Sequence, residues 1–170
     1  MKISVAFSRI FLALILGFLL GITIRSTYEL TARQPHKWKY KPAIINCAGK
    51  DINKQTIERA INFWISKKEE IYFFEYDSNL KICKNIELVD GFIIIKTQTD
   101  EILEKEVLAS TKRKSKLNII QSAVITFKPG THNFELLLEH ELGHAFGYRH
   151  RKIPGHIMHP YYDMMGDKFW

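Results

Sequence analysis

Repeats and low-complexity tracts are absent from the 170-residue sequence, and cysteine is scarce, with only Cys47 and Cys83. The length suffices for one globular core of ordinary size and leaves none for a second domain. A hydrophobic content of 46% with 25% charged residues excludes a wholly disordered chain. The two cysteines allow one disulfide if the domain sits outside the cytosol, and two buried free thiols are the alternative.

Acidic residues are outnumbered, with 18 Asp and Glu against 25 Lys and Arg, which gives a formal net charge of +7. This excess favours acidic partners such as membrane surfaces, anionic polymers or nucleic acid. The densest basic run, residues 112–116, contains no aromatic residue of the kind that stacks on bases. We therefore expect a solvated loop in this run and no nucleic-acid partner.

One apolar run, residues 10–24, is bounded by Arg9 and Arg25 and is typical of a signal peptide or a short signal anchor. A helix of this length would reach roughly 22 Å, short of a hydrocarbon core of about 30 Å, so spanning needs neighbouring residues or arginine snorkelling. No small-x-small cleavage site follows the run, which favours an uncleaved anchor. We expect residues 1–25 to make the protein membrane-anchored or exported, with its orientation left open because basic residues flank both sides.

Residues 26–42 are polar and basic, contain Pro35 and Pro42, and predict a linker that precedes a single domain of residues 43–170. Aromatic and β-branched residues near turn signals predict strands in five segments of this domain. The five segments are residues 43–47, 70–76, 92–96, 117–120 and 123–127. Residues 99–110 are ambiguous between a loop and a short helix.

Two helices are predicted. Asp51 can cap the first, which has apolar residues at helical spacing. Its expected buried face is Ile57, Ala60, Ile61, Trp64 and Ile65. The second begins near Thr131 or Asn133, either of which can cap it, and ends at Phe146, with Gly147 just past its end. This order of strands and helices indicates an α+β or α/β domain with one mixed sheet.

The second predicted helix carries a metal-binding pattern. Residues 140–150 match H-E-x-x-H-x-x-G-x-x-H at every fixed position. His140 and His144 lie four residues apart on one helical face, so both can reach one zinc ion. Gly147 permits a left-handed turn that brings His150 back as the third ligand and leaves a fourth position for water. Glu141 lies beside the metal, where it can serve as the general base.

This segment resembles the zinc-binding signature of the metzincin metallopeptidases, and the residues after it resemble the matrixin branch. In residues 155–160, Met158 matches the methionine of the clan's Met-turn, although ordinary core packing is an alternative for it. The spacing from Met158 to Pro160, with Tyr162 following, resembles that of the matrixin branch. This resemblance implies that Pro160, Tyr161 and Tyr162 wall a primed-side substrate pocket. The other histidines, His132, His156 and His159, are expected to be exposed or hydrogen-bonded rather than ligands.

The resemblance also implies a zincin-like α+β fold. In this fold a twisted mixed sheet of about five strands packs on two main helices, and the zinc-binding helix is followed by the Met-turn. An edge strand from about residues 117–120 would pair with extended substrate. We expect three departures from the family, namely a C-terminal helix that is absent or reduced to a turn, no cysteine-switch propeptide, and no His/Asp-rich loop for structural zinc or calcium. One catalytic zinc ion is therefore the expected cofactor.

We expect a zinc-dependent endopeptidase that hydrolyses polypeptide by a zinc-activated water, with Glu141 as general base. Two alternatives stay open. One is a zinc-stabilised, non-catalytic binding or structural module, favoured by the apolar N-terminal segment and the short C-terminus. The other is a cell-wall peptide hydrolase, favoured by the expected export and the basic charge.

Overall fold

The structure is a computed structural model that describes residues 37–76, 80–84, 88–97 and 107–169. The apolar run 10–24 and most of the ambiguous segment 99–110 lie outside these residues. The signal or anchor role of the apolar run therefore stays a prediction. Within the described ranges, no helix combines the length and the apolar character that crossing a bilayer demands.

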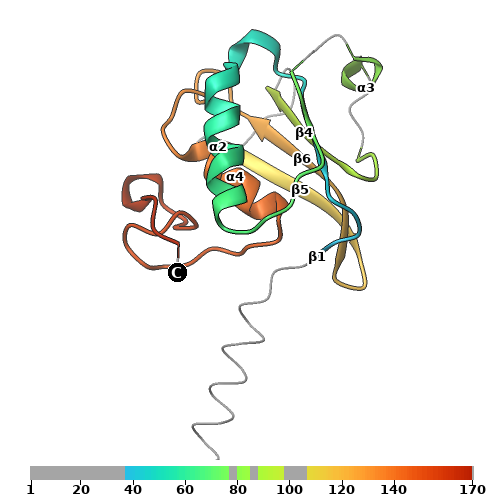
Figure 1. The fold of residues 1–170 in the computed structure, drawn as a ribbon. Coiled ribbons are helices and arrows are strands. Elements are labelled where there is room, and N and C mark those ends of the chain that lie inside the picture. Colours follow the sequence, from blue (N-terminus) through green and yellow to red (C-terminus); the bar gives the residue numbers. More distant parts are fainter. Residues whose placement is uncertain (1–36, 77–79, 85–87, 98–106, 170) are drawn as a thin grey trace, which may run out of the picture. The chain divides into compact units, whose positions relative to one another are not determined.

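Six strands of the described residues form one mixed sheet (Figure 1). The strands are β1 (Lys37–Trp38), β2 (Ala43–Asn46), β3 (Phe74–Glu75), β4 (Phe92–Thr97), β5 (Ala109–Lys116) and β6 (Ile119–Phe127). Five of them run parallel in the order β1-β6-β4-β2-β3, and β5 pairs antiparallel with β6. Ile44 lies opposite Ile93, and Ile94 lies opposite Val124, in buried strands that are rich in isoleucine, as central parallel strands usually are. The predicted mixed sheet is confirmed.

The edge strand differs from the prediction. β5 includes the basic run 112–116, which we expected to be a loop. Leu117 and Asn118, expected at the start of an edge strand over 117–120, instead form the turn between β5 and β6. Their φ angles are 51° and 62°, as a two-residue type I′ hairpin turn requires. A polar strand at a sheet edge lacks the hydrophobic alternation that marks a strand in sequence, which explains the error.

Two other strands differ in extent from their predicted segments. β1 falls inside the segment 26–42 that we expected to be a linker, and it pairs with Ile119 and Ile120 of β6. The sheet therefore begins before residue 43. β3 has two residues, whereas the sequence predicted a strand over residues 70–76. β2 and β4 lie where the sequence placed them.

Helix α2 (Lys54–Ser66) is capped by Asn53, whose side chain accepts a 2.7 Å hydrogen bond from the backbone N–H of Thr56. Asp51, the predicted cap, belongs to the 3-10 turn η1 (Gly49–Asp51) and accepts a hydrogen bond from Thr97. Four of the five predicted core positions are buried, but Ile65 is 51% exposed. An α-helix turns about 100° per residue, so Ile65 lies roughly 80° around the helix from Ile57, the first buried residue. This places Ile65 at the border of the apolar face.

Helix α3 (Lys81–Lys84), which the sequence did not predict, contains Cys83. Cys83 forms a disulfide with Cys47, the residue that directly follows β2, and their Cα atoms are 5.3 Å apart. Of the two alternatives left open by the sequence, the structure has the disulfide.

Helix α4 (Leu137–Ala145) starts later than predicted. Neither suggested residue caps it, because Leu136 holds the N-cap position. The Thr131 hydroxyl instead lies 2.7 Å from the Leu108 carbonyl oxygen and 2.8 Å from that of Lys128. A short 3-10 turn, η2 (Tyr162–Met164), follows near the end of the chain.

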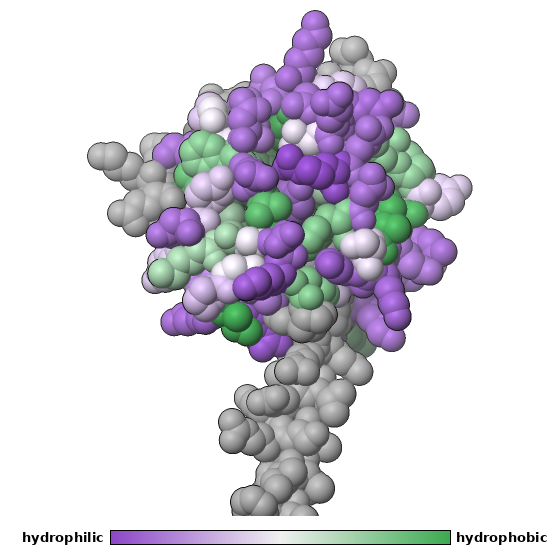
Figure 2. Space-filling view, turned by 60° about the vertical axis from the view of Figure 1, so that its left-hand side comes forward, coloured by the Kyte–Doolittle hydropathy of each residue, from purple (hydrophilic) through white to green (hydrophobic). Residues whose placement is uncertain are grey.

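Helices α2 and α4 pack against each other and share one hydrophobic core with the sheet (Figure 1). Two hydrogen bonds join the helices, since Arg59 Nε donates to Glu139 Oε1 at 2.7 Å and Trp64 Nε1 donates to the Glu139 carbonyl at 2.7 Å. Trp64, Phe127 and Phe146 are the largest fully buried side chains. Figure 2 shows that hydrophilic residues cover most of one outer face, with apolar residues in small separate patches. Such scattered apolar exposure is ordinary for a folded domain.

Candidate metal centre and substrate cleft

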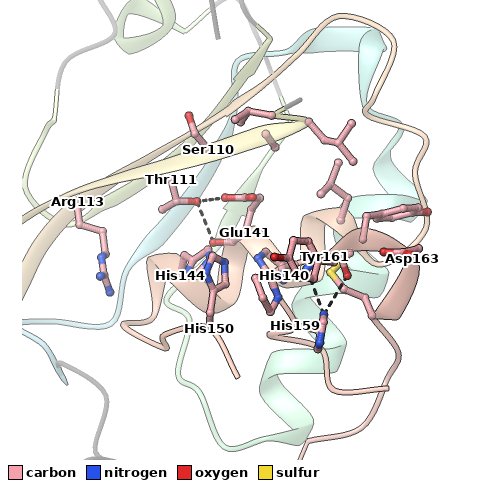
Figure 3. Close-up of a pocket in the computed structure, with 17 residues that line it drawn as sticks. Ser110, Thr111, Arg113, His140, Glu141, His144, His150, His159, Tyr161 and Asp163 are labelled. Atoms are coloured by element: carbon pink, nitrogen blue, oxygen red, sulfur yellow. Dashed lines mark hydrogen bonds between the residues drawn. The ribbon is translucent and has the colours of Figure 1, made fainter. Parts of the chain in front are cut away.

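Three histidines from α4 and the segment that follows it lie close together (Figure 3). His140 and His144 belong to the helix, and His150 lies on the segment that follows it. Their candidate ligand atoms all lie within 4.8 Å of one another, and the Nε2 atoms of His144 and His150 are 3.0 Å apart. Two nitrogen ligands of one tetrahedral zinc ion are separated by roughly 3.3 Å, given bonds of about 2.0–2.1 Å. The cluster therefore has the dimensions of a metal site.

The end of α4 turns the chain back toward this cluster. Gly147 has a φ of 103°, the left-handed conformation that the sequence predicted for it. Its N–H donates to the carbonyl of His144 at 3.0 Å, and the N–H of Tyr148 donates to that of Gly143 at 2.9 Å. These two bonds form a Schellman motif, which ends the helix and satisfies two of its last carbonyls. The reversal brings His150 beside His144.

Backbone carbonyls orient two of the rings. His140 Nδ1 lies 2.8 Å from the carbonyl oxygen of Ile157, and His144 Nδ1 lies 2.9 Å from that of Tyr148. Because a carbonyl only accepts hydrogen bonds, each Nδ1 carries the proton and donates. The lone pair of each Nε2 is then available to a metal ion, as in many protein metal sites.

Burial keeps the imidazoles neutral. Burial first, together with the charge of neighbouring histidines, lowers the pKa of His140 to about 4 and the pKa of His144 to about 3. Burial also lowers the pKa of His150. Only a neutral imidazole can bind a metal, so the rings are in the ligating form at neutral pH before any ion arrives.

Glu141, the next residue after His140, is a buried carboxylate on the same helix. The hydroxyl of Thr111 on β5 lies 2.5 Å from its Oε2 and donates a hydrogen bond to it. Burial raises the pKa of Glu141 to about 7, and the bond from Thr111 opposes that rise. No sequence pattern singles out Thr111, because its contact joins a strand that we did not predict to a helix residue 30 positions further along the chain.

Met158 is fully buried and packs against α4. A Cβ atom at Gly143 would lie 2.3 Å from the Met158 sulfur and 2.6 Å from Cζ2 of Trp64. A side chain at position 143 would therefore force Met158 or Trp64 to shift. The Met158 carbonyl accepts a 2.8 Å hydrogen bond from the N–H of Arg151, which holds residues 155–160 near the metal-binding segment.

A cleft of about 510 Å³ opens beside the histidines (Figure 3). Residues 107–111 and Arg113 line one wall, while Pro160, Tyr161 and Tyr162, the three predicted pocket residues, line another. Sequence reasoning missed the contribution of residues 107–113. It also missed His159, which lines the cleft and accepts a 3.2 Å hydrogen bond from the N–H of Tyr161.

The α+β fold and a histidine cluster at the edge of an open cleft are features of a metallopeptidase domain. Comparison with family models supports this class, since the model described as Matrixin (Peptidase_M10) matches residues 33–169. The chain therefore belongs to the matrixin family, and the resemblance seen in the sequence is confirmed. Membership implies a zinc metalloendopeptidase that acts on polypeptide. Comparison with curated proteins gives no match.

Proposed function

We propose that this matrixin is an endopeptidase in which His140, His144 and His150 hold one catalytic zinc ion and Glu141 is the general base. One observation carries the proposal, namely that three neutral imidazoles with converging nitrogens lie beside a buried carboxylate in an open cleft. Three protein ligands are typical of catalytic zinc, whereas structural zinc usually has four. When bound, the ion supplies Lewis-acid polarisation of the substrate carbonyl and lowers the pKa of water.

Glu141 can move the proton in both halves of the reaction. Its carboxylate accepts a proton from water as the water oxygen attacks the carbonyl carbon of the substrate. It then gives that proton to the amine nitrogen as the C–N bond breaks. A carboxyl group whose pKa is about 7 is suited to both steps near neutral pH. Thr111 holds Oε2, which leaves Oε1 for the proton.

The edge of β5 is the proposed binding site for extended substrate. β5 pairs with β6 alone in the part of the chain that the structure describes, so its outer edge can present backbone groups along the cleft. A peptide can add to such an edge as a further strand. Pro160, Tyr161 and Tyr162 would wall the pocket for the side chain after the scissile bond, and Met158 would form the Met-turn beneath the metal.

We also propose that the domain acts outside the cytosol, either anchored or exported through residues 1–25. The Cys47–Cys83 disulfide supports this location, because disulfides persist mainly in oxidising compartments. Cell fractionation followed by thiol labelling tests it, since a reduced protein in the cytosolic fraction would contradict the proposal.

The catalytic proposal is tested with the zinc-loaded full chain and the matched variant Glu141→Gln on a peptide library, with metal analysis of both. We expect the wild type to cleave, and Glu141→Gln to keep one zinc ion while cleavage falls roughly 10²- to 10⁴-fold. His140→Ala, His144→Ala and His150→Ala should lose the metal instead. Wild-type rates in Glu141→Gln would refute its role as base.

Two further outcomes would favour the alternatives. Stoichiometric zinc without chelator-sensitive hydrolysis of any peptide would favour a non-catalytic zinc-stabilised module. Release of peptides from peptidoglycan fragments, with none from protein substrates, would favour a cell-wall hydrolase.

A further inference from the structure

Arg113 is a cation inside the cleft on the edge strand. It lies two residues after Thr111, and residues two apart in a strand face the same side. Because Thr111 reaches Glu141, this side faces the histidine-bearing helix, and Arg113 lines the cleft. Its neighbour Lys114 is exposed and forms a 2.9 Å ion pair with Asp90. The two adjacent basic residues therefore have different surroundings.

The guanidinium of Arg113 has no anionic partner among the described residues. Its Nη1 atom is buried and makes no hydrogen bond there. Burial lowers the pKa of Arg113, and the nearby positive charge of Arg149 lowers it further, although arginine stays charged in proteins. A buried N–H without an acceptor is costly, and a carboxylate placed beside it would relieve that cost. The surroundings of Arg113 therefore suit an anion supplied by a ligand.

Figure 3 places Arg113 on the opposite side of the histidines from Tyr161 and Asp163. A peptide that pairs antiparallel with β5 would have its amino-terminal part beside Arg113 and its carboxyl-terminal part beside Tyr161. Arg113 is two residues further along β5 than Thr111, a distance of about 7 Å along the strand. The peptide residue that it meets is thus within about three residues of the scissile bond.

We propose that Arg113, assisted by Arg149, is a specificity-determining residue that binds an aspartate or glutamate side chain on the amino-terminal side of the scissile bond. This inference rests on the proposed peptidase function and adds the substrate class that the cleft selects. Arg113 is the main contact because it lines the cleft, whereas Arg149 does not line it and is exposed on the segment that leads to His150.

The test compares kcat/KM for peptides that are identical except for Glu or Gln at each of the three residues before the scissile bond. Wild-type protein should prefer Glu at one of these positions roughly tenfold or more, the usual effect of a charge-assisted hydrogen bond. Arg113→Gln should remove the preference, and Arg113→Glu should reverse it toward Lys. Lys114→Gln is the matched control, since it removes the same charge from the same strand, and it should keep the preference.

Equal cleavage of the Glu and Gln peptides by wild type, or an unchanged Glu preference in Arg113→Gln, would overturn the inference while leaving the peptidase assignment intact. Failure of the proposed function is distinguishable, because the wild type would then cleave no peptide. If the wild type cleaves no peptide, peptide binding is measured instead. Labelled extended peptides with a single central Glu or Gln are titrated with the zinc-loaded Glu141→Gln protein, and fluorescence anisotropy reports their binding. Tighter binding of the Glu peptide that is lost in Arg113→Gln/Glu141→Gln supports the inference, and equal binding refutes it.

Discussion

The hydroxyl of Thr111 on β5 donates a 2.5 Å hydrogen bond to Oε2 of Glu141 on α4. The same hydroxyl lies 3.1 Å from the backbone carbonyl of Glu141, but its single proton can serve only one acceptor at a time. This contact joins the proposed substrate-binding strand directly to the proposed base. The orientation of the carboxylate therefore depends on the strand beside which the peptide would lie.

Replacing Thr111 with valine removes this bond while keeping the β-branched shape. We expect kcat to fall about tenfold with zinc content unchanged, because the carboxylate is no longer oriented. The bond lowers the pKa of Glu141, so its loss should also shift the acid limb of the activity profile to higher pH. The measurement is kcat/KM against pH with parallel metal analysis.

Thr111→Ser is the matched control, since it retains the hydroxyl and should restore most of the activity and the position of the acid limb. A valine variant with the activity and pH profile of the serine variant would show that the hydroxyl does not position Glu141.

The stability of the metal-free protein should depend on pH through the buried histidines. Burial lowers the pKa of His140 to about 4 and that of His144 to about 3, from 6.5. These rings take up protons mainly on unfolding, so their contribution to stability is lost as pH falls below 6.5. Glu141 opposes this trend, because its pKa of about 7 in the folded protein favours protonation of the native state. The two histidine shifts together exceed the opposing shift, so stability should fall toward pH 4.5.

Urea midpoints measured in chelator at pH 7 and pH 5 test this balance. Glu141→Gln removes the opposing group, so its midpoint should fall more steeply with acid than that of the wild type. A wild-type midpoint that rises in acid, or equal slopes in the two proteins, would contradict the expected balance.

Gly143→Ala tests the close approach of Met158 to α4. A Cβ at this position would overlap the Met158 sulfur and the Trp64 ring. Overpacking of this kind typically costs about 1–3 kcal/mol, which urea unfolding can measure. In a Met158→Ala background the nearer clash disappears, so the cost of Gly143→Ala should shrink. An equal cost in both backgrounds would show that Met158 does not limit the space.

Much of the candidate metal centre could be predicted from sequence because its geometry is local. The three histidines and Gly147 within residues 140–150 define a helix face, its end and the reversal after it. Each of these follows from helix periodicity and from the backbone freedom of glycine. The reversal at Gly147 is present in the structure as predicted.

The wall of the cleft that β5 forms could not be predicted, because it depends on pairing between distant segments. β5 consists largely of polar and basic residues, and its pairing with β6 stabilises a strand that hydrophobicity does not mark. Thr111 and Arg113 belong to no short motif, and only the fold brings them to α4. The prediction of the α2 cap was wrong for a different reason. Asp51 and Asn53 are both suitable cap residues and lie two positions apart. Asp51 belongs to the 3-10 turn Gly49–Asp51, so Asn53 caps the helix.

The hydrogen bond from His140 Nδ1 to Ile157 spans 17 positions and ends outside the eleven-residue motif. Rotation of this imidazole is thus restrained by a part of the chain that motif searches ignore. A peptide cut at residue 150 would contain every donor nitrogen, yet it would leave one ring without its backbone anchor. Grafting the centre onto another scaffold would require transplanting the polypeptide through Ile157.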